Sequence, residues 1–126
     1  MPAKIKIRTG TIELEAELND SPTAKAIAQV LPITATVQTW GDEIYFPIPV
    51  SMHLEPDAKT VVSVGDIGYW PRGKAFCIFF GPTPISRGNE IVPASAVNIV
   101  GRVKGDAKLF KEAKDGDEIK IELMSE

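Results

Sequence analysis

The sequence has little of what common catalytic and metal-binding sites require. Its 126 residues include one cysteine, Cys77, and one histidine, His53, whereas a familiar zinc site uses three or four thiolate and imidazole ligands. The glycine-rich motifs that cradle phosphates, G-x-x-x-x-G-K-[ST] and G-x-G-x-x-G, are also missing. We therefore expect no metal ion and no cofactor.

An excess of positive charge and long apolar segments are missing as well. The chain has 14 Lys and Arg against 17 Asp and Glu, with a net charge of −3, which disfavours binding to nucleic-acid phosphates. No apolar run approaches the roughly 20 residues that span a bilayer, and residues 1–18 lack the pattern of a secretory signal. From the charge and the short apolar runs we expect no nucleic-acid and no membrane partners. Because the lone cysteine lies in an apolar run, as a buried free thiol does, we expect the reducing environment of the cytoplasm.

What is present is an ordinary globular mixture, 44% hydrophobic and 25% charged, at a length typical of one domain. We expect a single domain over residues 1–126. Polar and apolar residues alternate in 4–8 and 11–18, which predicts an N-terminal β-hairpin that turns at Gly10. The basic residues of the first strand would face the acidic residues of the second as cross-strand ion pairs.

The rest of the chain predicts short strands and two short helices. A Ser-Pro start and a following proline predict a helix over 22–31, and an aspartate cap with a glycine stop predicts another over 107–114. Further strands are expected at 34–40, 43–46, 75–80, 97–103 and 117–124, and a short strand or an extended stretch at 60–64. Turns are expected over 65–73 and a loop over 81–95. A last strand that pairs with the first hairpin favours a closed β-barrel, with a sandwich as the alternative.

Aromatic residues are concentrated in the middle of the chain, where eight of the nine lie between positions 40 and 80. Several adjoin Gly or Pro, as aromatic residues at the mouths of barrels and in shallow apolar sites do. Phe76 and one of the neighbours Phe79 and Phe80 are expected in the core. The expected ligand-binding residues are Trp40, Tyr45, Phe46, Trp70 and Phe79, with Gln38, Thr39 and Arg72 as polar contacts. For Trp40, Tyr45, Phe46 and Trp70, the sequence leaves open whether the side chain lies in the core or at the rim of the pocket.

The titratable residues do not suggest a catalytic arrangement. Cys77 is expected to be a buried thiol, and its use as a nucleophile with His53 is the alternative. The carboxylate pairs 42–43 and 117–118 stand at turn-to-strand junctions, where neighbouring side chains point to opposite faces and do not share a proton or a metal. No catalytic residue is assigned.

Three segments resemble the signature sequences of the small prokaryotic cyclophilin-like proteins. They are W-G-D-E-I-Y-F at 40–46, G-D-I-G-Y-W-P at 65–71 followed by G-K-A at 73–75 and F-F-G at 79–81, and P-A-S-A-V-N at 93–98. The resemblance extends over nearly the whole chain. It implies a mainly β fold, the cyclophilin-like closed eight-stranded antiparallel β-barrel with two short capping helices, and no established biochemical role.

Three functions stay open. The first is a module that binds a peptide or a small apolar ligand in an aromatic pocket. The second is a weak peptidyl-prolyl cis-trans isomerase, although no arginine lies between Arg8 and Arg72, where the cyclophilin isomerases carry one on a central strand; Arg72 is then the candidate donor. The third is an assembly module that buries the aromatic patch between subunits, so a monomer and a small homo-oligomer are both possible outcomes.

Overall fold

The computed structural model describes residues 3–124 and shows a mainly β protein. Within this range the strands are β1 (Lys4–Thr9), β2 (Ile12–Leu18), β3 (Ile33–Thr36), β4 (Gln38–Thr39), β5 (Glu43–Pro47), β6 (Asp66–Trp70), β7 (Ala75–Phe79), β8 (Asn98–Lys104) and β9 (Glu118–Leu123). The helices are α1 (Pro22–Val30) and the short 3₁₀ helices η1 (Pro71–Gly73) and η2 (Ala107–Glu112). No helix in this part of the chain is long and apolar enough to cross a membrane.

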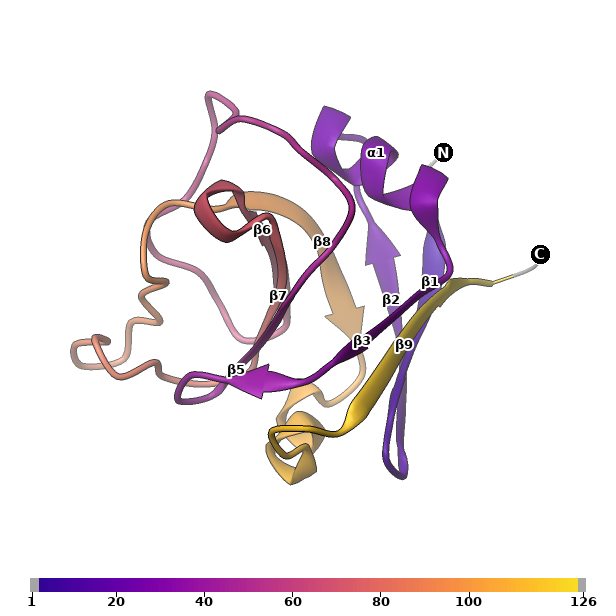
Figure 1. The fold of residues 1–126 in the computed structure, drawn as a ribbon. Coiled ribbons are helices and arrows are strands. Elements are labelled where there is room, and N and C mark those ends of the chain that lie inside the picture. Colours follow the sequence, from indigo (N-terminus) through magenta and orange to yellow (C-terminus); the bar gives the residue numbers. More distant parts are fainter. Residues whose placement is uncertain (1–2, 125–126) are drawn as a thin grey trace.

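The strands form one antiparallel sheet in the order β3-β9-β1-β2-β8-β6-β7-β5-β4. The strands at its two ends, β3 and β4, are consecutive in the chain and are separated only by Val37. The sheet therefore curls back on itself into a nearly closed barrel (Figure 1). This confirms the predicted fold class. The strand count is nine rather than eight because the expected strand 34–40 is divided at Val37, whose N–H donates to the Asp117 carbonyl at 2.8 Å.

The N-terminal hairpin and its role in closing the barrel are as predicted. β1 pairs with β2 on one side and with β9 on the other. Along β1 the buried residues Ile5 and Ile7 alternate with basic residues, so one face of the hairpin enters the core. On the other face the Arg8 Nε lies 2.9 Å from a Glu13 carboxylate oxygen, one of the expected cross-strand ion pairs.

Helices lie at the two ends of the barrel (Figure 1). Helix α1 begins after Ser21, whose Oγ accepts a hydrogen bond from the Ala24 N–H at 3.2 Å, and it buries Ile27 in the barrel cluster. At the other end η2 buries Phe110, whose ring lies 6.2 Å from that of Phe80. η2 is a 3₁₀ helix that ends at Glu112, shorter than the helix expected over 107–114.

One prediction for residues 60–73 was wrong. Residues 60–64, expected as a short strand or an extended stretch, form no regular strand and contribute one isolated bridge, Val62 to Ile91. The expected turns over 65–73 contain β6 instead, a central strand between β8 and β7. Gly68 suggests a turn, yet it serves close packing, because a Cβ there would lie 3.0 Å from Val97 Cγ2. The packing of the sheet overrides the local turn preference.

β7 is buried on both faces and separates two hydrophobic clusters. Phe76 and Ile78 point into the barrel, where the rings of Phe46 and Phe76 stack with centroids 5.4 Å apart. On the outer face lies a smaller cluster that consists of Val62, Ala75, Cys77, Phe79, Ile91 and Val97. Phe79 and Phe80 point to opposite faces, as predicted, but both are buried, because each face has its own cluster.

Candidate functional site

The outer cluster opens into a cavity of about 260 Å³. It lies between the outer face of β5, β7 and β6 and the segment 93–97. Its lining residues are Trp40, Glu43, Tyr45, Trp70, Cys77, Pro93, Ala94 and Val97. The lining is therefore apolar and aromatic, with a single carboxyl group.

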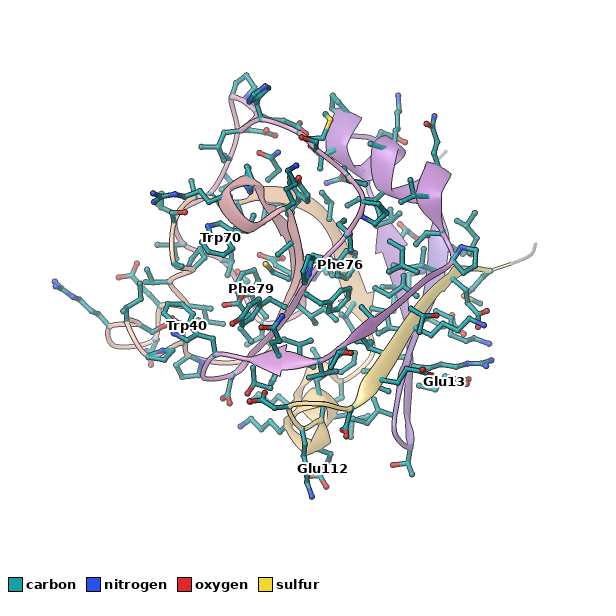
Figure 2. The ribbon with its side chains drawn as sticks, viewed as in Figure 1. Glu13, Trp40, Trp70, Phe76, Phe79 and Glu112 are labelled. Atoms are coloured by element: carbon teal, nitrogen blue, oxygen red, sulfur yellow. The ribbon has the colours of Figure 1, made fainter. Side chains whose placement is uncertain are left out.

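Strand register brings these side chains to one face. In the antiparallel pair of β5 and β7, Tyr45 lies opposite Cys77, and Glu43 lies opposite Phe79. Residues two apart on a strand share a face, so the Glu43 and Tyr45 side chains both meet that of Cys77. β6 adds Trp70, which lies at the level of Ala75. Figure 2 shows Trp40, Trp70 and Phe79 on one side of β7 and Phe76 on the other.

Trp40 is positioned by a tight turn that precedes β5. Its backbone N–H donates to the Glu43 carbonyl at 3.0 Å, and the Asp42 N–H donates to the Pro82 carbonyl at 2.9 Å. Gly41 has a φ of +61°, and a Cβ there would lie 2.9 Å from the Pro82 carbonyl oxygen, closer than van der Waals contact allows. Glycine is required at this position because the turn packs directly on the backbone of the following loop.

Trp70 is held by the segment that forms the opposite wall. Its indole Nε1–H donates to the Ser95 Oγ at 2.6 Å. Lys59 and Val97 exchange two backbone hydrogen bonds, of 2.8 and 3.0 Å, which tie this segment to residues 59–62. The loop is further closed by a hydrogen bond from the Thr83 hydroxyl to the Val92 carbonyl. The wall of the cavity is therefore a fixed part of the fold.

Glu43 is the one ionisable group of the lining with a pKa near neutrality. The residue is 5% exposed, and burial raises its pKa to about 7, while a hydrogen bond with the Cys77 side chain acts in the opposite direction. Burial and the neighbouring Glu43 raise the pKa of the Cys77 thiol well above its usual value. Near neutral pH Glu43 is thus present in both its protonated and its ionised form, whereas Cys77 remains a thiol, which is a poor nucleophile.

Three of the eight predicted site residues line the cavity: Trp40, Tyr45 and Trp70. Phe46 lies in the barrel interior and Phe79 in the outer cluster, and both are fully buried. Neither belongs to the lining.

The three predicted polar contacts lie elsewhere. Gln38 is exposed on β4, and the Thr39 hydroxyl donates to an Asp115 carboxylate oxygen at 2.7 Å. Arg72 is exposed on η1. None of these three is a lining residue.

The sequence analysis missed Glu43 and Cys77 as members of the site. The spacing of Glu43 from Tyr45 on one strand contained the signal for Glu43, because residues two apart share a face. The contact with Cys77 depends on the register of β5 against β7. Cys77 is buried, as predicted, and its polar neighbour is Glu43, while His53 is exposed.

The described residues contain no group of three or more His, Cys, Asp and Glu side chains that could hold a metal ion. The chemistry that the cavity offers is therefore apolar contact, aromatic faces and one carboxyl group.

Comparison with known proteins agrees with this fold. The family described as cyclophilin-like matches residues 3–122. The solution structure of the hypothetical protein AF2241 from Archaeoglobus fulgidus is similar, with 44% sequence identity and a TM-score of 0.83, over 98% of this chain and 95% of that one. No curated protein matches the chain. The chain belongs to the cyclophilin-like family.

Proposed function

We propose that the protein is a binding module that holds a small apolar ligand, or one apolar side chain of a peptide, in the outer cavity. The observation that carries this proposal is that Trp40, Tyr45 and Trp70 are only partly buried and line one concave space. Removing the remaining exposed surface of large aromatic side chains from water lowers the free energy of the system. A ligand in the cavity supplies that burial.

The volume limits the size of the ligand. The cavity measures about 260 Å³, slightly smaller than ordinary ligand pockets, which occupy roughly 300–1,000 Å³. A compact molecule or a single side chain fits this space. A longer peptide would place one residue in the cavity and the remainder on the surface around it.

The lining favours binding over prolyl isomerisation. An isomerase needs an apolar seat for the proline ring and a hydrogen-bond donor aimed at the imide. The seat is present, but the candidate donor Arg72 is outside the lining. The indole N–H of Trp70 is already bonded to Ser95.

The experiment is a titration with neohexanol, a small alcohol that carries a tert-butyl group. Both tryptophans of the chain line the cavity, so their fluorescence and their indole N–H signals in ¹H–¹⁵N spectra report on it directly. We expect a saturable change in both signals. Tyr45→Ala should abolish it in a folded protein, and Gln38→Ala, outside the cavity, should not.

Two results would overturn the proposal. One is the absence of any saturable change at either indole. The other is a saturable change that persists unaltered in a folded Tyr45→Ala variant, which would place the binding outside the cavity that Tyr45 lines. Light scattering during the titration tests the assembly alternative, because a second copy seated in the cavity would be displaced by ligand and the mass would fall.

A further inference from the structure

The lining combines three aromatic side chains with one acid. Trp40, Tyr45 and Trp70 surround the same space as Glu43, and no Lys or Arg is among the lining residues. Aromatic faces carry a negative quadrupole that attracts cations, and tryptophan does so most strongly. We infer that the preferred ligand of the proposed binding site is a small methylated ammonium ion of the choline type, a conclusion that rests on the proposed function.

The buried acid distinguishes a cationic ligand from a neutral one. Glu43 is 5% exposed in the unliganded protein, and any ligand in the cavity covers it further. A carboxylate removed from water without a partner is unfavourable. A neutral apolar ligand therefore forces Glu43 to stay protonated, whereas a cation provides a partner for the ionised form.

The scarcity of acceptors distinguishes a methylated ammonium from a primary one. A primary ammonium has three N–H donors and is strongly hydrated, so its burial requires several acceptors. Among the lining side chains only the Glu43 carboxyl and the Tyr45 hydroxyl are good acceptors, because the two tryptophans have none and the Cys77 sulfur is a weak one. A quaternary ammonium has no N–H group and presents methyl groups to the rings while it keeps its charge.

Protonation of Glu43 should couple to binding. Burial raises its pKa to about 7, and a cation favours the ionised form, so binding near neutral pH releases a proton. Cys77 from β7 and Tyr45 from β5 are the other titratable groups of the lining, and the Cys77 thiol stays neutral because its pKa is raised. The nearby Asp42 carboxylate lies 3.8 Å from Lys111 Nζ. Glu43 is therefore the group that should determine the pH dependence.

The test compares choline with neohexanol, in which carbon replaces the quaternary nitrogen at nearly constant shape. Dissociation constants are measured by calorimetry and by the indole N–H signals. At pH 8 we expect choline to bind at least about tenfold more tightly than neohexanol. Below the Glu43 pKa of about 7 the choline affinity should fall by about tenfold for each pH unit, and the neohexanol affinity should not fall.

Variants assign the effect to one carboxyl group. Glu43→Gln keeps the shape and removes the charge, so at pH 8 it should lower the choline affinity by at least about tenfold and abolish the pH dependence, while the attraction of the aromatic rings remains. Asp42→Asn is the matched control, because Asp42 is the adjacent carboxylate and lies outside the lining; it should bind choline as the wild type does. N-acetyl-trimethyl-lysine amide is titrated in parallel, and tighter binding of this probe than of choline would identify a modified peptide side chain as the source of the same headgroup.

The outcomes separate the inference from the function on which it rests. Equal affinity of the wild type for choline and neohexanol at pH 8, or a Glu43→Gln variant that binds choline as tightly as the wild type, overturns the inference and leaves the apolar binding site intact. If neither compound binds in a saturable manner, both fail. Selective, pH-dependent binding of choline that is weakened in Glu43→Gln supports both.

Discussion

The two faces of β7 differ in how their side chains are covered. On the inner face Phe76 packs within a barrel made of paired strands and is fully buried. On the outer face Cys77 and Phe79 are covered by an irregular loop that is held by isolated bridges at Val62 and Val97. The first covering is complete, and the second leaves a cavity. One strand therefore supports stability on one side and carries the candidate site on the other.

The polar groups of the two faces differ in the same way. In the barrel the buried Tyr69 hydroxyl donates a hydrogen bond to the Val50 carbonyl at 2.5 Å. At the outer face the buried polar group is Glu43, with a pKa of about 7. A group that is costly to bury is typical of functional sites rather than of cores. The difference supports the proposal that the outer face is a binding site.

The largest effect expected from this comparison concerns stability. Phe76→Ala should lower the free energy of unfolding by about 3–5 kcal/mol, the usual cost of removing a buried phenyl ring. Trp70→Ala should cost roughly half of that or less, because the indole is partly exposed. Urea unfolding followed by circular dichroism measures both. Equal losses would show that the outer face is as much a core as the inner one.

A somewhat smaller effect is expected from the charge of Glu43. Its folded-state pKa of about 7 exceeds the ordinary value of 4.5, so the folded protein binds the proton more tightly than the unfolded chain. This contribution is favourable at low pH and is lost as the pH rises from 4.5 through 7. Relative to Glu43→Gln, the wild type should lose about 3 kcal/mol between pH 4.5 and 8.

Unfolding curves of both proteins at these two pH values check the prediction. Gln38→Ala provides the control, since the loss of this exposed, uncharged side chain should leave the pH dependence of the wild type unchanged. A constant difference between wild type and Glu43→Gln at both pH values would contradict a raised pKa.

The contact between the turn at Gly41 and the loop that follows β7 can be tested with a matched pair of glycines. Gly41 and Gly88 have φ values of +61° and +58°, but a Cβ at Gly88 meets nothing within 4 Å. Alanine should cost about 1 kcal/mol of strain at both positions, and Gly41→Ala should cost about 1–2 kcal/mol more because of the collision with the loop. Gly41→Ala should also weaken neohexanol binding. Thermal unfolding of the two variants measures the difference, and identical shifts would argue against the packed turn.

The smallest effect is expected outside both clusters. Arg8 is half exposed and pairs with Glu13, so Arg8→Ala should change stability by less than about 1 kcal/mol and leave ligand binding unchanged. Thermal unfolding and the neohexanol titration measure both quantities. A loss of binding would mean that the hairpin and the cavity are coupled through the barrel.

The sequence was sufficient to predict those strands whose polar and apolar residues alternate. The hairpin and its pairing with β9 follow from residues that alternate along β1. Alternation along β5 would also have separated Tyr45, at the cavity, from Phe46, in the barrel. β6 was missed because Gly68 indicates a turn by itself, and its reason for being glycine, the contact with Val97, is a tertiary one.

Predicting the full set of site residues requires the register between neighbouring strands. That Glu43 meets Cys77 follows from the pairing of β5 with β7, which a single sequence does not provide. Arg72 was selected as the candidate donor beside Pro71, but η1 places it at the surface. Neighbours in sequence on a short helix have no fixed relation to a cavity built on strands.

The most direct test of the account is the ¹H–¹⁵N spectrum of the protein during a neohexanol titration. If the outer face of β7 is the binding site, the indole N–H signals of Trp40 and Trp70 shift and saturate together, while the amide signals of β1 and β9 stay in place. Saturating shifts confined to β1 and β9, or indole signals that do not move, would contradict the account.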